Sequence, residues 1–107
     1  LNSDGACKTG MISGGGWSEI QGGGVVLAFS CSFGRGTAIQ AEARALYTGL
    51  IVCSEKVDIS KVEVDSLVLI EPLKGNRPTP WNIKYIVRRC RVMLRQNTIL
   101  SHTWREG

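Results

Sequence analysis

Three acidic residues, Asp4, Glu42 and Asp65, occupy positions where a carboxylate needs an explanation. Glu42 is the most informative of them, because a helical projection places it among residues that should face a sheet. These residues are Ala38, Ala45, Leu46, Gly49 and Cys53. A buried ionised carboxylate is costly unless it is paired, hydrogen-bonded or bound to a metal ion. Taken alone, Glu42 is explained equally well by a place at the rim of the sheet, where it would favour the positive end of the helix dipole.

The two aspartates are weak signals one by one. Asp65 follows the apolar alternation of Val62 and Val64 and could be a helix N-cap, a role for which Ser66 competes. Asp4 precedes a glycine, and this dipeptide often only makes a turn. Together, two aspartates on strands and a glutamate on a helix that crosses the sheet could meet, and three hard oxygen ligands suit magnesium or manganese. Such a set fits hydrolysis of a phosphodiester with two metal ions, which needs no nucleophilic side chain.

The elements that would position these residues can be read from the periodicity of the chain. Glycine clusters at Gly14–Gly16 and Gly22–Gly24 indicate turns and close strand packing. The expected strands are Leu1–Cys7, Trp17–Gln21, Val25–Phe33, Lys61–Asp65 and Thr98–Trp104. The expected helices are Thr37–Lys56 with Thr37 as N-cap, Ser66–Lys74, and Trp81–Gln96 after a turn-rich break at Gly75–Pro80. This order predicts an α/β fold with a mixed sheet and helices packed on it.

The last of these helices carries a basic stripe. Its members recur at helical spacing without an acidic neighbour: Lys84, Arg88, Arg91 and Arg95. We expect the stripe to bind nucleic-acid phosphates, with a plain solvated surface as the alternative. An adjacent apolar face is expected to pack on the sheet and consists of Ile83, Ile86, Val87, Cys90 and Leu94. Trp81 and Trp104 could stack on bases, but we expect both to pack in the core.

Bulk properties narrow the class of protein. The 107 residues fit one domain, 1–107, with 43% hydrophobic residues and no apolar run long enough for a membrane span. The net charge of +4 favours a polyanionic partner. Four dispersed cysteines and one histidine make a zinc site an unlikely use of these residues, and we expect buried, reduced thiols inside the cell, in nucleus or cytoplasm. The start at Leu1 suggests a domain excised from a longer protein, and we expect it to be monomeric.

Four segments give the chain its resemblance to a known family: Asn2–Ala6, Ala41–Leu46, Val64–Ser66 and His102–Gly107. They resemble the type 1 ribonuclease H family, especially plant ribonuclease-H-like domains related to retroelement polyproteins. The resemblance implies a five-stranded sheet on which Asp4, Glu42 and Asp65 bind two Mg²⁺ or Mn²⁺ ions. It also implies endonucleolytic cleavage of the RNA strand of an RNA–DNA hybrid, recognised by groove shape and 2′-hydroxyl groups.

Departures from the family pattern leave an alternative open. The chain ends at Gly107, where members continue into a helix that supplies a fourth carboxylate, so the domain is expected to be truncated and without its C-terminal helix. His102 resembles the histidine that opens the last motif of plant members and is a candidate site residue. The alternative is a catalytically inactive nucleic-acid-binding module on the same fold, and a third reading is a structural or protein-interaction remnant.

Overall fold

The computed structural model describes residues 1–19, 26–54, 61–64, 67–75, 77–94 and 99–102. The strands are β1 (Asn2–Lys8), β2 (Met11–Glu19), β3 (Val26–Arg35), β4 (Lys61–Val64) and β5 (Ile99–His102). The helices are α1 (Ala38–Ser54), α2 (Leu67–Lys74) and α3 (Lys84–Met93), the last preceded by a 3₁₀ turn, η1 (Trp81–Ile83). The predicted order of elements is confirmed, as is the mixed α/β class.

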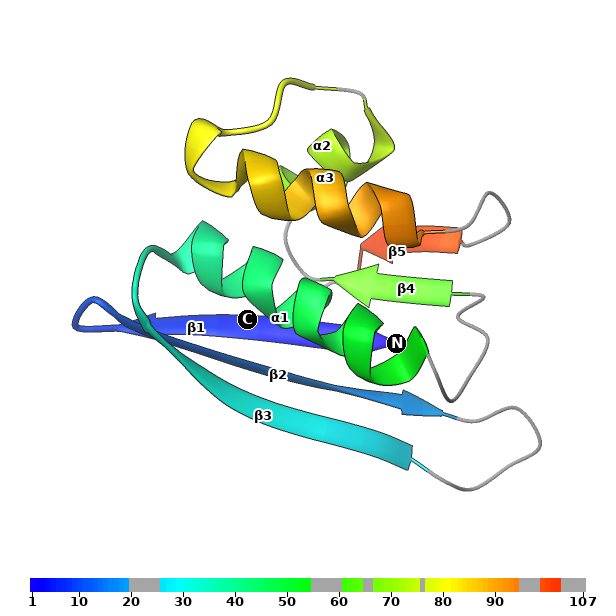
Figure 1. The fold of residues 1–107 in the computed structure, drawn as a ribbon, viewed down its shortest axis with the longest axis horizontal. Coiled ribbons are helices and arrows are strands. Elements are labelled where there is room, and N and C mark those ends of the chain that lie inside the picture. The colour runs from blue at the N-terminus through cyan, green and yellow to red at the C-terminus, as the bar shows by residue number, and fades with distance from the viewer. Residues whose placement is uncertain (20–25, 55–60, 65–66, 76, 95–98, 103–107) are drawn as a thin grey trace.

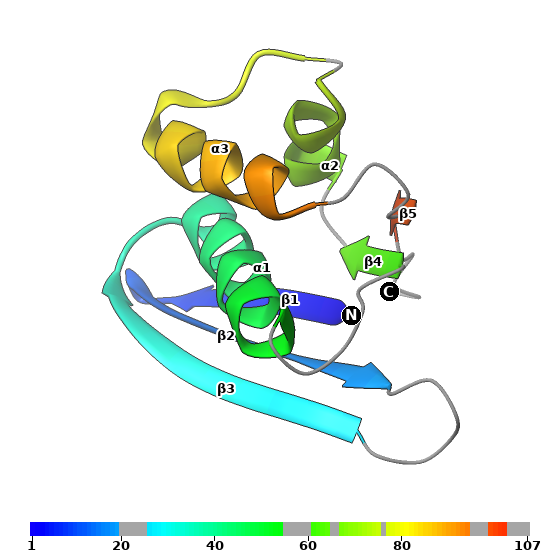
Figure 2. The ribbon, with the colours of Figure 1, turned by 45° about the vertical axis from the view of Figure 1, so that its right-hand side comes forward.

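The sheet has the strand order β3-β2-β1-β4-β5. β1, β2 and β3 form an antiparallel meander, while β4 pairs in parallel with both β1 and β5. α1 lies across β1 and β2, and α2 lies against β4 and β5, on the same face of the sheet (Figure 1, Figure 2). β1 is therefore the central strand, where the antiparallel and parallel halves meet.

The glycines of β2 show where the prediction and the structure differ. The turn between β1 and β2 is at Thr9 and Gly10, which have positive φ, and β2 begins at Met11 rather than at Trp17. The interpretation of Gly14–Gly16 as a turn is therefore wrong. A Cβ atom on Gly14 would lie 2.7 Å from the Cβ of Ala45 on α1 and 2.9 Å from the ring of Phe33. Glycine here allows α1 to pack closely on the sheet, whereas the sequence indicated close packing between strands.

The start of α1 confirms Thr37 as the N-cap. The amide of Gln40 donates to Thr37 Oγ1 at 3.4 Å, and the amide of Thr37 donates to Gln40 Oε1 at 2.8 Å. This reciprocal pair satisfies two donors at the helix start that would otherwise lack partners. The helix that carries Glu42 therefore begins at a position fixed by its own side chains.

α3 buries the apolar face that the sequence predicts, but mainly against other partners. Ile83, Val87 and Cys90 are almost completely buried in a core shared with β4 and the other helices. The expectation that this face packs on the sheet is met only in part, because it shares the core with Val62 and Val64 of β4 while α3 lies mainly against α1 and α2. The expectation for Trp81 is wrong, since its side chain is 88% exposed.

The cysteines only partly follow the expectation of buried thiols. The free thiols in the described part of the chain are Cys7, Cys31 and Cys90. Cys90 is buried, which raises its pKa to about 12, whereas Cys7 is exposed on β1 and its thiol donates to the carbonyl of Gly36. The side chain of Cys53 is not among those that the structure describes. None of the described helices is long and apolar enough to cross a membrane.

Candidate functional site

The backbones of β1 and α1 touch at Gly5. A Cβ atom on Gly5 would lie 2.3 Å from the carbonyl carbon of Ala41 and 2.4 Å from the amide nitrogen of Glu42, closer than real side chains approach. Only glycine allows this contact, since it lacks a Cβ atom. The contact places the backbone of α1 at Glu42 directly against Gly5, the residue after Asp4.

Both carboxylates are partly withdrawn from solvent. Asp4 and Glu42 are half-buried, and each has one fully buried oxygen, Oδ1 of Asp4 and Oε2 of Glu42. The Oγ of the neighbouring Ser3 is buried as well. The place therefore combines acidic oxygen atoms with low solvent exposure, which is the donor chemistry that hard divalent cations prefer.

The third predicted carboxylate, Asp65, lies outside the described residues. Its predecessor Val64 is the last residue of β4 and pairs with Ser3 of β1, the residue before Asp4. Within the described residues, no three acidic, histidine or cysteine side chains gather in a way that could hold a metal ion. The two described carboxylates fit a metal site by chemistry, and the set of three remains a prediction.

The face of α1 around Glu42 is largely as predicted. Ala45, Leu46 and Gly49 are buried, so Glu42 does extend from the packed side of the helix toward its border. Ala38, predicted to share this face, is the first residue of α1 and is exposed. Glu42 is thus a border residue with a buried oxygen, which combines the two explanations that the sequence left open.

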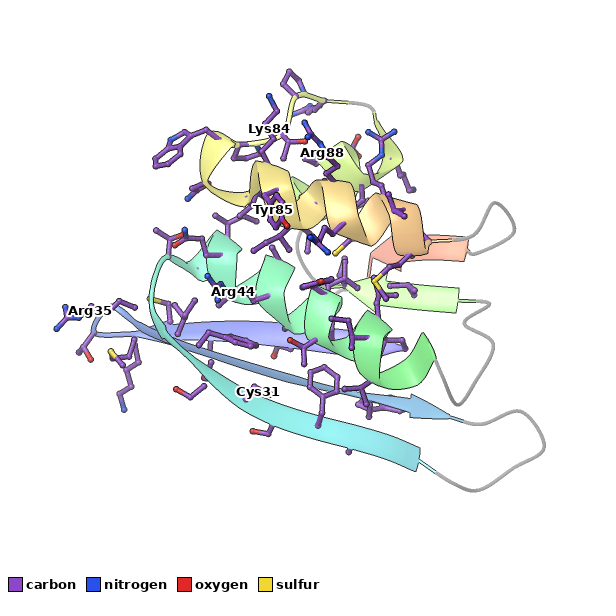
Figure 3. The ribbon with its side chains drawn as sticks, viewed as in Figure 1. Cys31, Arg35, Arg44, Lys84, Tyr85 and Arg88 are labelled. Atoms are coloured by element: carbon purple, nitrogen blue, oxygen red, sulfur yellow. The ribbon has the colours of Figure 1, made fainter. Side chains whose placement is uncertain are left out.

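Three of the four predicted stripe residues are described, and all three lie exposed on α3. Lys84, Arg88 and Arg91 line a surface pocket of about 420 Å³ together with Thr79 and Val92. Lys84 and Arg88 extend from the side of α3 that is turned away from α1 (Figure 3). Arg95 and Trp104 lie outside the described residues.

His102 is the last residue of β5 and pairs with Val64 of β4. Val64 in turn pairs with Ser3 of β1, so the backbones of these three residues form one row across the sheet. β4 therefore stands between His102 and the strand that carries Asp4. The side chain of His102 is not described, and its role stays a prediction.

Sequence reasoning did not single out the pair Tyr85 and Arg89. The guanidinium carbon of Arg89 lies 4.8 Å from the centroid of the Tyr85 ring, and Arg89 donates a hydrogen bond to the Tyr85 hydroxyl. That hydrogen bond raises the pKa of Arg89 above its ordinary value. The four-residue spacing of an aromatic residue and an arginine on one helix was the signal that could have identified this pair.

Comparisons with known proteins agree with this architecture. A family described as reverse transcriptase-like matches residues 2–107. A protein of Arabidopsis thaliana, described as a candidate ribonuclease H protein, is 33% identical over all of this chain, which spans 18% of that relative's length. The crystal structure of ribonuclease H1 from the archaeon Halobacterium salinarum superposes with a TM-score of 0.77 at 25% identity, covering 95% of this chain and 80% of that one. LC11 ribonuclease H1 in complex with an RNA/DNA hybrid superposes with a TM-score of 0.80 at 19% identity, covering 98% and 84%.

A mixed sheet of this order, covered on one face by helices, defines a ribonuclease-H-like fold. The chain belongs to the ribonuclease-H-like family described as reverse transcriptase-like.

Proposed function

We propose that this chain is a domain of a metal-dependent ribonuclease that cleaves the RNA strand of RNA–DNA hybrids. Asp4, Glu42 and Asp65 are the proposed metal ligands and catalytic residues. The observation that carries the proposal is the contact of β1 with α1 at Gly5, which sets Glu42 next to the strand of Asp4, each with a buried carboxylate oxygen. When bound, divalent ions supply the activation of a water molecule and the stabilisation of charge on the leaving oxygen.

The protein's own part in this chemistry is positioning. The capped start of α1 and the contact at Gly5 hold Glu42 in one place, so its carboxylate does not need to be ordered when a ligand arrives. Asp65 directly follows Val64, whose pairing with Ser3 supports its placement beside Asp4 in the proposed site. Lys84, Arg88, Arg91 and Arg95 are proposed to contact phosphates of the nucleic acid, and His102 is kept as a candidate site residue.

The alternative is a nucleic-acid-binding module that has kept the fold without the catalytic activity. The exposed Lys84, Arg88 and Arg91 favour it, because they form a basic surface on α3 that does not involve the carboxylates. In both cases we propose that residues 1–107 act as a monomeric domain of a longer protein. The free thiols among the described residues suit the inside of a cell.

The experiment is a comparison of metal binding and hybrid cleavage in a protein that carries this domain with its natural flanking sequence. Binding of Mn²⁺ and Mg²⁺ is measured by calorimetry, and cleavage is followed on a hybrid with a labelled RNA strand. We expect Asp4→Asn and Asp65→Asn each to weaken metal binding by more than about tenfold and to abolish cleavage, because each removes a charged ligand.

The matched control is Glu71→Gln, which removes an acidic residue from α2 instead and should leave both measurements unchanged. Unchanged Mn²⁺ titrations in Asp4→Asn and Asp65→Asn would refute the metal site. Salt-sensitive binding of the hybrid without cleavage by the unaltered protein would establish the inactive module instead.

A further inference from the structure

Trp81 is the most exposed of the large apolar side chains that the structure describes. Its side chain is 88% exposed, although burial of so large an apolar side chain would be favourable. The backbone beneath it is nevertheless fixed. Asn82 donates to Thr37 Oγ1 at 3.5 Å, its carbonyl accepts from the side chain of Gln40, and Ile83 is buried in the core. Trp81 is therefore an exposed ring on an anchored turn.

Basic residues follow Trp81 along α3. Lys84 follows Trp81 by one turn, and Arg88 follows Lys84 by another, both exposed on α3. Together with Arg91 and Thr79 they line the surface pocket of about 420 Å³. A Cβ atom on Gly75 would lie 3.5 Å from a guanidinium nitrogen of Arg91, so this side chain reaches from α3 to the end of α2. The pocket joins positive charges to a hydroxyl group, a combination that suits a phosphate.

A second aromatic residue and a further cation are also exposed on α3. Tyr85 is 64% exposed and lies one turn after Trp81, on the part of α3 nearer to α1 (Figure 3). Arg89 lies over its ring and is also exposed. η1 and α3 therefore expose two aromatic rings together with several cations. No acidic residue occurs between Pro72 and Leu94, so nothing on this stretch of chain cancels the charge.

We propose that this face of η1 and α3 binds single-stranded nucleic acid, with a base stacked on Trp81 and the adjoining phosphates held by Lys84, Arg88 and Arg91. Stacking on an aromatic ring combined with backbone phosphate contacts is the chemistry that recognises single strands, because the bases of a duplex are not available. The arrangement goes beyond the proposed function, since it requires neither a metal ion nor the carboxylates of β1 and α1. It adds a single-stranded segment to the nucleic acid that the domain can hold.

The test is binding of a fluorescein-labelled oligothymidylate in EDTA, followed by anisotropy, with a duplex of equal length as the comparison ligand. We expect Trp81→Ala to weaken binding of the single strand about tenfold, the usual effect of removing a stacking ring. Binding of the duplex should change by less than about twofold, since it relies on phosphate contacts. Trp81→Phe keeps a smaller ring, so its affinity for the single strand should lie between those of the unaltered protein and Trp81→Ala. Arg88→Gln should lower the slope of log K against log salt by about 0.7 for the single strand.

Two controls separate this surface from other effects. Trp17→Ala removes a tryptophan exposed on β2 and should leave binding unchanged. Glu71→Gln should also leave it unchanged, and the EDTA keeps a failure here distinct from a failure of the metal site. Single-strand binding by Trp81→Ala within twofold of the unaltered protein would overturn the proposal, as would an equal loss for the duplex. Equally tight binding of an acidic peptide, with the same loss in Trp81→Ala, would also overturn it and assign the surface to a protein partner.

Discussion

At the scale of single residues, Gly5 has the most direct link to the candidate site. Its missing side chain lets β1 touch the backbone of α1 between Ala41 and Glu42. The sequence drew attention to Asp4 and Glu42 as ligands, placed Gly5 in the expected strand Leu1–Cys7, and offered a turn at Asp4 and Gly5 as the alternative. Its use as a contact could not be read from the sequence, because the residues that it touches lie far along the chain and on another element.

Gly5→Ala is expected to destabilise the protein by about 1–3 kcal/mol, because the added methyl group must displace the backbone of α1. The measurement is the free energy of unfolding in urea. Ala6→Ser, a change of one atom at the next and exposed position of β1, serves as the control and should stay within about 0.5 kcal/mol of the unaltered protein. A Gly5→Ala protein as stable as the control would show that β1 and α1 do not touch in this way.

At the scale of elements, the strongest prediction from sequence was the helix Thr37–Lys56, and α1 confirms it with its cap. Capping residues act locally, so they are visible in a single sequence. The errors concern contacts between distant segments. Gly14–Gly16 was taken for a turn because the sequence does not show that Ala45 of α1 and Phe33 of β3 crowd this part of β2.

The same reason explains the partly wrong prediction for α3. Its helical spacing correctly separated a buried face from a basic face, but spacing alone does not show which element covers the buried face. Trp81 was assigned to the core because tryptophan is hydrophobic, whereas the η1 turn directs its neighbour Ile83 inward and leaves Trp81 outside. For the candidate site, residue types and the family resemblance identified Asp4 and Glu42. Their depth in the protein came from the structure.

Thr37→Ala is expected to cost about 1 kcal/mol of stability, because the amide of Gln40 loses its acceptor at the start of α1. Thr37→Ser keeps the hydroxyl group and should recover most of the loss. Urea unfolding of the three proteins measures the difference. If the alanine and serine variants are equally stable, the cap does not contribute as its geometry indicates.

At the scale of the whole molecule, Cys90 connects stability to pH. Its thiol is buried where α3 meets the shared core, and burial raises its pKa to about 12, above the value of the unfolded chain. Between the two pKa values the thiol is protonated in the folded state and ionised in the unfolded chain. Its contribution to stability is fully present below the unfolded pKa and is lost as the pH rises toward the folded pKa. The relevant window therefore lies between the ordinary thiol pKa and about 12.

The expected result is that the stability advantage of the unaltered protein over Cys90→Ala narrows as the pH is raised through this window. Urea unfolding at neutral and at alkaline pH measures both proteins, and the comparison cancels the other groups that titrate there. Val87→Ala is the matched control, since it shortens a buried side chain of the same helix that carries no titratable group. A constant difference between the unaltered protein and Cys90→Ala across the window would contradict the burial of this thiol.

The strand order β3-β2-β1-β4-β5 also bears on how the chain folds. β1 and β2 meet across the tight turn at Thr9 and Gly10, whereas β1 joins β4 by pairing Ser3 with Val64, much further along the chain. The entropy lost on closing a loop grows with its length, so the parallel junction is the more costly closure. Asp4 lies on β1 and Glu42 on α1, and both elements belong to the part of the fold that is built from consecutive segments, β1 to α1. The contact of Gly5 with Ala41 closes a shorter loop than the pairing of Ser3 with Val64, so β1 and α1 can bring these two carboxylates near one another before β4 and β5 are added.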